Sequence, residues 1–266
     1  MPLLTLLRHG TPTDLPPLLI VHGLFGSARN WGAIAKRMSD SREVIAVDMR
    51  NHANSFWDGD HSYAAMAADL AAVIAAEGHP MDVLGHSMGG KAAMVLALTR
   101  PAQVQRLVVA DIAPVAYPHS QNHLIAAMRG LDLSGVDSRS EADRRLSASV
   151  QDPGVRAFLL QSLDLKATPP RWRLNLDTLE RHMDQTTGWI DDSALTPFDK
   201  PALFLTGALS DYVKPTDRAH IRALFPQAKM AKIPGAGHWL HAEKPQTFYH
   251  IVHGFLKPGS EPDDVV

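Results

Sequence analysis

The chain has 266 residues, of which 45% are hydrophobic, so it has enough apolar side chains for a large core and is not a disordered protein. Lysine and arginine number 26 against 28 aspartates and glutamates, which gives a formal net charge of −2. This balance excludes the broad basic surface of a nucleic-acid-binding protein. The absence of cysteine excludes disulfides, thiolate nucleophiles, cysteine-ligated zinc and iron–sulfur clusters.

The N-terminal segment lacks the pattern of a signal peptide, because Arg8 and His9 interrupt the apolar stretch Met1–Leu7 before an h-region forms. No segment approaches the roughly 18 uninterrupted apolar residues of a membrane-spanning helix. The sequence therefore predicts a cytoplasmic protein with no membrane span and no nucleic-acid partner. No heptad or apolar stripe indicates an assembly, so a monomer and a small homo-oligomer stay open as alternatives.

Short apolar runs alternate with helical patterns along much of the chain, which is typical of βαβ units and a mainly parallel sheet. Continuous runs of valine, isoleucine and leucine indicate strands that are buried on both faces. We expect strands over Leu18–Val21, Val44–Val47, Met81–Leu84, Arg106–Ala110, Ala202–Leu205 and Lys229–Ile233.

Helix start and stop signals lie between these runs. Ser62 can cap a helix that Gly78 and Pro80 end, and Pro101 ends another. The tail from Pro258 is rich in glycine, serine, proline and aspartate, and we expect it to be frayed. The helices expected around the strands are Tyr63–Glu77, Met88–Thr99 and Pro245–Leu256.

The alternation stops between about Pro114 and Phe198, where the patterns are helical. Helices are expected over Glu141–Val150, Gly154–Leu163 and Trp172–Gln185. Insertions of this kind belong at the C-terminal edge of a parallel sheet, where ligands bind. We therefore expect residues 114–198 to form a helical lid on an α/β core made of residues 1–113 and 199–266.

A G-x-S-x-G motif, Gly85-His86-Ser87-Met88-Gly89, stands between an expected strand and an expected helix. A nucleophile at this place occupies a strained turn, and only glycines two residues to either side let the neighbouring backbone pass so close. The turn aims the hydroxyl outward. Ser87 is therefore the candidate nucleophile, and an ordinary strand-to-helix turn is the alternative.

A serine hydroxyl needs a base to take its proton. His238 follows the last expected strand in Gly235-Ala236-Gly237-His238, on a loop at the same sheet edge. Two carboxylates compete for the role of holding its ring. Asp211 gives the chain order of an α/β-hydrolase, serine then acid then histidine, which favours it. Asp111 ends the neighbouring strand and can approach the same imidazole.

Donors to a developing oxyanion are expected in the glycine-rich segment after the first strand, with the amides of Leu24 and Met88 as the candidates. Phe25 is then expected to face the acyl pocket. Trp172 and Trp189 of the lid are either core residues or substrate contacts. No metal ligand set is expected, because the histidine pair at 119 and 123 lacks a third ligand.

Five motifs lie within residues 18 to 256: His22-Gly23-Leu24-Phe25-Gly26-Ser27, Asp48-Met49-Arg50-Asn51-His52, Gly85-His86-Ser87-Met88-Gly89-Gly90-Lys91, Asp111-Ile112-Ala113-Pro114 and Gly237-His238-Trp239-Leu240-His241-Ala242-Glu243-Lys244-Pro245. Together they resemble the YbfF-type bacterial esterases, small lidded α/β-hydrolases related to a mitochondrial abhydrolase-domain protein. The resemblance implies hydrolysis of carboxylic esters with short-to-medium acyl chains, or of acyl thioesters, without a metal or organic cofactor.

The resemblance also bears on two local questions. Because members of that family do not all carry an acid at the position of Asp211, it raises Asp111 to an equal candidate. Most α/β-hydrolases have glycines where this chain has Asn51 and Ala53, which puts the conformation of that turn in question.

The residues thus predict a serine carboxylesterase that acts on a small-molecule ester through an acyl-enzyme. A C–C bond hydrolase or a perhydrolase with the same triad is the alternative among enzymes. A ligand-binding receptor on a hydrolase scaffold is the alternative outside them. The natural substrate depends on how the lid packs.

Overall fold

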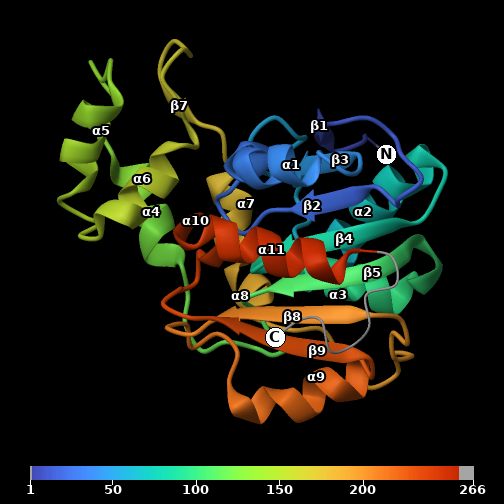
Figure 1. The fold of residues 1–266 in the computed structure, drawn as a ribbon. Coiled ribbons are helices and arrows are strands. Elements are labelled where there is room, and N and C mark those ends of the chain that lie inside the picture. Colours follow the sequence, from blue (N-terminus) through green and yellow to red (C-terminus); the bar gives the residue numbers. More distant parts are fainter. Residues whose placement is uncertain (1, 258–266) are drawn as a thin grey trace.

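The computed structural model describes residues 2–257, and its centre is a seven-stranded sheet (Figure 1). The strand order is β1-β3-β2-β4-β5-β8-β9. Neighbouring strands run parallel except β1, which pairs antiparallel with β3 at one edge. This confirms the predicted mainly parallel sheet. The strands are β1 (Thr5–His9), β2 (Leu18–Val21), β3 (Val44–Asp48), β4 (Met81–His86), β5 (Val104–Ala110), β8 (Ala202–Gly207) and β9 (Ala228–Ile233).

The central strands follow the apolar runs because both faces of the sheet are covered. Every residue of β2, β3, β4 and β8 is buried. The sequence did not predict β1, whose residues are all exposed or half-buried. An edge strand with solvent on one side does not need a continuous apolar run, so this segment lacks the pattern that marks the others.

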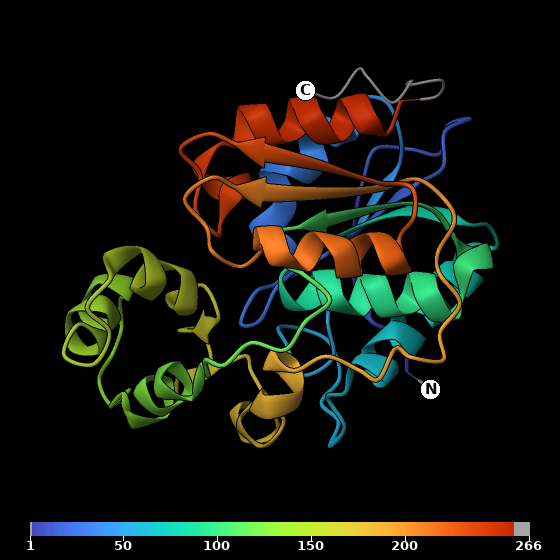
Figure 2. The same cartoon turned by 90° about the horizontal axis from the view of Figure 1, so that it is seen from below.

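Helices cover the two faces of the sheet (Figure 2). One face packs against α2 (Tyr63–Glu77), α3 (Met88–Thr99) and α9 (Arg218–Leu224), and the other against α1 (Gly32–Met38), α10 (Leu240–Glu243) and α11 (Pro245–Phe255). The predicted cap of α2 is present, since the Ser62 side chain accepts from the Ala65 amide and Gly78 ends the helix with φ 78°. The predicted frayed tail from Pro258 lies outside the described residues.

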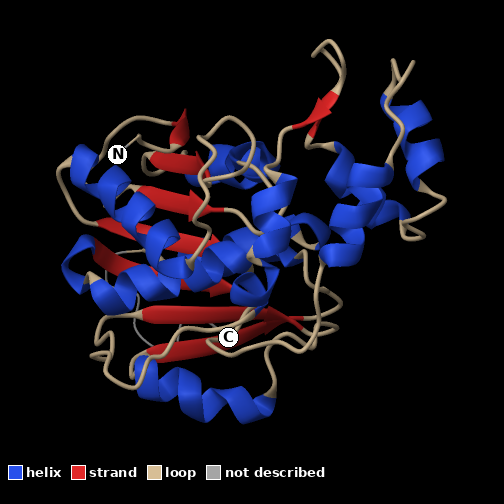
Figure 3. Cartoon of the chain, turned by 180° about the vertical axis from the view of Figure 1, so that it is seen from behind, coloured by secondary structure: helices blue, strands red, loops and turns tan. Residues whose placement is uncertain are grey.

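The residues between β5 and β8 extend beyond the C-terminal ends of the parallel strands (Figure 3). Most of this insertion has its own apolar cluster, which runs from Ile125 to Met183 and includes Phe25 of the core. Trp189 instead packs against the apolar cluster of the central sheet. The part of the insertion that has its own cluster is therefore shorter than 114–198. The insertion contains α4 (Asn122–Gly130), α5 (Arg139–Leu146), α6 (Pro153–Leu160), α7 (Leu176–Arg181) and α8 (Met183–Thr187), with a two-stranded ladder of β6 (Leu163–Asp164) and β7 (Arg171–Trp172).

The insertion is hydrogen-bonded to the turn that follows β3. The Ala53 amide donates to the Arg173 carbonyl at 2.7 Å, and the Asn175 amide donates to the Asn51 carbonyl at 3.0 Å. Asn51 and Ala53 have φ 65° and 48°, so this turn takes the conformation that glycines favour although neither residue is glycine. The question that the sequence raised about this turn is answered, and His52 lies between the two bonded residues.

Candidate active site

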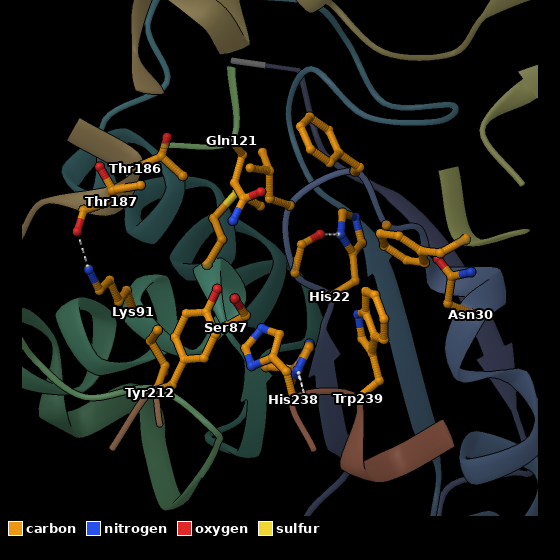
Figure 4. A pocket seen from close by; sticks show the side chains of 18 of the residues that line it. His22, Asn30, Ser87, Lys91, Gln121, Thr186, Thr187, Tyr212, His238 and Trp239 are labelled. Atoms are coloured by element: carbon orange, nitrogen blue, oxygen red, sulfur yellow. Dashed lines mark hydrogen bonds between the residues drawn. The ribbon is translucent and has the colours of Figure 1, made fainter. Parts of the chain in front are cut away.

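Ser87 lies in the turn between β4 and α3, with φ 53° and ψ −122°. Backbone of this kind is strained and persists where the surroundings enforce it. The flanking glycines make it possible: a Cβ on Gly85 would lie 2.3 Å from the Gly89 carbonyl oxygen, and one on Gly89 would lie 2.4 Å from that of His22. The steric reason for the G-x-S-x-G spacing is therefore present, and the Ser87 side chain faces a cavity (Figure 4).

His238 lies beside Ser87 in the same cavity, on the loop between β9 and α10 (Figure 4). Its Nδ1 donates to Oδ2 of Asp111 at 2.8 Å. Because a neutral imidazole carries one proton, this bond leaves the lone pair on Nε2. A ring held in this state can take a proton from a neighbouring hydroxyl.

Asp111 is fully buried directly after β5, with φ 51°. Its Oδ1 accepts from the Gly207 amide at 3.0 Å, and its Oδ2 accepts from the Ser210 hydroxyl as well as from His238. Three donors thus hold an ionised carboxylate under the histidine. Sequence reasoning did not find Ser210, which carries no pattern of its own.

Asp211 does not contact His238. Its side chain is exposed, and its carboxylate has no hydrogen bond or ion pair in the described part of the chain. The preference for Asp211 is therefore wrong about which carboxylate meets the ring. Chain order does not separate the two acids, because Asp111 also lies between Ser87 and His238 in the sequence. β5 and β8 are neighbours in the sheet, so the end of β5 lies under the His238 loop, whereas the loop after β8 presents Ser210 there and turns Asp211 to solvent.

The predicted oxyanion donors face the same cavity. Leu24 and Met88 both line it beside Ser87. Met88 begins α3, and the first N–H groups of a helix have no partner within the helix. The Leu24 loop is tight, because Phe25 has φ 63° and the Gly26 amide donates to the Gly23 carbonyl at 3.0 Å. Neither amide donates a hydrogen bond to another group among residues 2–257, so both are candidates to bind an oxygen atom of the substrate.

Two buried histidines hold this loop. His22 donates from Nδ1 to the Gly23 carbonyl at 2.7 Å and accepts on Nε2 from the Met49 amide at 2.9 Å. His52 donates from Nδ1 to a backbone carbonyl and accepts on Nε2 from the Phe25 amide at 3.1 Å. Burial lowers the pKa of His22 to about 4 and that of His52 to about 3, so both rings stay neutral and keep these acceptors.

Other rings fix His238 in place. Tyr212 stacks on it with centroids 4.0 Å apart, and His86 donates from Nε2 to its backbone carbonyl at 2.9 Å. His241 is buried and stacks on Trp31 at 4.1 Å. Burial lowers the pKa of His241 to about 3. His86 is buried, and its contact with His238 could not be seen in the sequence.

The cavity has a volume of about 290 Å³, and Phe25 lines it as predicted. Trp172 and Trp189 are not among the lining residues, so the prediction that they contact substrate is not supported by their positions. Trp172 is buried inside the insertion, where its Nε1 donates to the Met128 carbonyl at 2.7 Å. Trp189 donates from Nε1 to Asp192 at 2.6 Å and packs near the sheet.

Among residues 2–257, no three histidine, cysteine, aspartate or glutamate side chains gather as a metal ion would require. None of the helices in that range combines the length and the apolar character needed to cross a lipid bilayer.

A parallel sheet, a serine on the turn after a central strand and a histidine on the loop after the last strand define the class of an α/β-hydrolase. Residues 16–245 match the family model described as "alpha/beta hydrolase fold", and the chain belongs to that family.

Comparison with individual relatives shows which members of the family this chain resembles. The chain is 37% identical to "Esterase YbfF" of Escherichia coli K12, over 90% of this chain and 92% of that one. It is 43% identical to "sn-1-specific diacylglycerol lipase ABHD11" of Mus musculus, over 96% and 85%. A solved "Marine microorganism esterase" superposes with TM-score 0.89 at 38% identity, covering 95% of this chain and 99% of that one. These relatives confirm the predicted resemblance to YbfF-type α/β-hydrolases.

Proposed function

We propose that this chain is a serine carboxylesterase that works through an acyl-enzyme. The observation that carries the proposal is the hydrogen bond from His238 Nδ1 to the buried Asp111, next to Ser87 on its strained turn. The relatives named as esterases and lipases agree with it and make the chain a carboxylic ester hydrolase. In this assignment Ser87 is the nucleophile, His238 the base and Asp111 the acid.

The reaction has two halves. His238 Nε2 takes the proton of the Ser87 hydroxyl as its oxygen attacks the ester carbonyl, and the Leu24 and Met88 amides bind the resulting oxyanion. Protonated His238 then gives its proton to the departing alcohol. Water, deprotonated by the same ring, attacks the acyl-enzyme and frees the acid. One oxyanion donor lowers the activation barrier of such a reaction by roughly 3–4 kcal/mol.

In this proposal the insertion over residues 114–198 works as a lid and limits the length of the acyl chain that the cavity accepts. Leu124, Val155 and Phe158 of the insertion line the cavity together with Phe25 of the core. A cavity of about 290 Å³ is at the small end for ligand sites, which favours short-to-medium acyl chains. Acyl thioesters stay an alternative, because the same residues serve both leaving groups.

The test is hydrolysis of p-nitrophenyl esters from acetate to palmitate, with the matching acyl-CoA thioesters, by wild type and Ser87→Ala. We expect an optimum at short-to-medium chains that is lost in the variant by several orders of magnitude. Circular dichroism and a thermal melt check that the variant is folded. Turnover retained in folded Ser87→Ala, or a folded wild type that forms one stoichiometric adduct without turnover, would contradict the proposal.

A further inference from the structure

Lys91 is a buried lysine in the wall of the active-site cavity. It lies one helical turn after Ser87 on α3, and its backbone amide donates to the Ser87 carbonyl at 3.0 Å. Its exposed fraction is 1%, and it lines the cavity. Figure 4 shows Lys91 on one side of Ser87, with Trp239 and Asn30 on the other. The mechanism proposed above does not use it.

The ammonium group has neutral partners. Nζ donates to the Thr187 carbonyl at 3.0 Å and to the Gly188 carbonyl at 2.5 Å. It also lies 4.6 Å from the ring centroid of Tyr117 and 5.7 Å from that of Tyr63. No carboxylate is among these partners in the described part of the chain. An ammonium has three donors, so one of them is not used by the two carbonyls.

A buried ammonium without a counter-ion costs free energy, and burial lowers the pKa of Lys91 to about 7. An apolar side chain of the same length would fill this place without that cost. Among the described residues that line the cavity, Lys91 is also the single lysine, arginine, aspartate or glutamate. Ligand cavities use a few polar groups in a mostly apolar wall to orient what they bind. The missing counter-ion is therefore expected to come with the ligand.

We propose that Lys91 binds a carboxylate carried by the substrate away from the scissile ester, so that esters with a remote acid group are preferred substrates. This inference rests on the proposed esterase function and names its substrate class. The backbone rises by about 6 Å over the four residues from Ser87 to Lys91, so the probes span a range of methylene chain lengths between the ester and the carboxylate.

The experiment compares matched esters with and without the charge. The probes are the monomethyl and dimethyl esters of succinic, glutaric, adipic and suberic acid, with acetate esters of ω-hydroxy acids and their methyl esters for a carboxylate on the alcohol side. Methanol or acetate release gives kcat/KM for each. We expect wild type to prefer the charged member of a pair at one chain length, on one side of the ester.

The variant Lys91→Met removes the charge. A charge-assisted hydrogen bond in a buried site predicts that the charged-to-neutral ratio of kcat/KM falls about 10- to 100-fold. Lys91→Gln keeps a donor for the two carbonyls but has no charge, so its charged-to-neutral ratio of kcat/KM should fall as well. Lys200→Met is the matched control, because Lys200 also donates to two carbonyls, those of Pro101 and Val104, and it does not line the cavity. It should leave the ratio unchanged.

The outcomes separate this inference from the proposed function. If Lys91→Met lowers kcat/KM for charged and neutral esters by the same factor, the inference is wrong. Lys91 then only stabilises residues 187–188 through its hydrogen bonds to their carbonyls. A wild type that hydrolyses the neutral esters and shows no preference for the charged ones also overturns it, while the esterase function stands. If no ester is hydrolysed, calorimetry with free adipate decides: weaker binding to Lys91→Met supports the carboxylate site, and equal or absent binding refutes it.

The pH dependence is a second readout. The preference for the charged ester should decrease from pH 6 to pH 8.5, because Lys91 loses its proton there while a carboxylate with a pKa of about 4–5 stays ionised. Three other titratable groups face Lys91: burial raises the pKa of Tyr63 and Tyr117, which therefore stay neutral, and lowers the pKa of His119. His238 acts in the same way on both esters, so its contribution cancels in the ratio. A flat ratio in wild type would contradict the inference.

Discussion

Replacement of Asp111 by asparagine tests the assignment of the acid most directly. The carboxylate accepts on Oδ1 from the Gly207 amide and on Oδ2 from His238 and the Ser210 hydroxyl. An asparagine has one NH₂ group, which must face one of these two sides. The Gly207 amide can only donate, whereas the histidine can change tautomer and the hydroxyl can turn to accept. The NH₂ group should therefore face His238.

In that orientation His238 accepts on Nδ1 and carries its proton on Nε2, so it cannot take the proton of Ser87. The wrong tautomer costs about 10⁴-fold in kcat where it has been imposed on such a triad. The assay is hydrolysis of p-nitrophenyl butyrate by Asp111→Asn, with ¹⁵N NMR of the His238 ring to report the tautomer. Asp211→Asn is the control, and as an exposed change it should stay within about two-fold. A mild Asp111→Asn together with a severe Asp211→Asn would refute the assignment.

Two further predictions concern the backbone around the site. His52→Leu leaves the buried Phe25 amide without its acceptor, so we expect kcat to fall about 10-fold with a smaller change in KM, and affinity for a trifluoromethyl ketone to fall with kcat. His52→Gln, whose Oε1 can accept, should restore most of the loss, and full activity in His52→Leu would speak against the role. Gly89→Ala puts a Cβ 2.4 Å from the His22 carbonyl oxygen, so a thermal melt should show a decrease of about 5–10 °C and activity should be lost. Gly59→Ala has open space and should match wild type in both measurements.

The sequence by itself determined the features that depend on local chemistry. The continuous apolar runs marked the buried strands, and the Ser62 cap and the left-handed Gly78 gave α2 its bounds. The glycines around Ser87 marked its turn, because the G-x-S-x-G spacing lies within five consecutive residues. Edge strand β1 escaped because it has no continuous apolar run, and α1 and α9 escaped because seven residues are too few to show a clear helical period.

Only the tertiary structure decided between the two aspartates, because both follow neighbouring strands and their chain positions do not say which one meets the ring. It placed Asp111 under His238 and turned Asp211 to solvent. It also buried Trp172 inside the insertion, away from the cavity. The sequence alone gives Lys91 no special role. Only the packing of α3 against the end of α8 shows that its ammonium group is buried among carbonyl groups without a counter-ion. Which groups meet across the fold depends on packing between distant segments, and no local pattern records that.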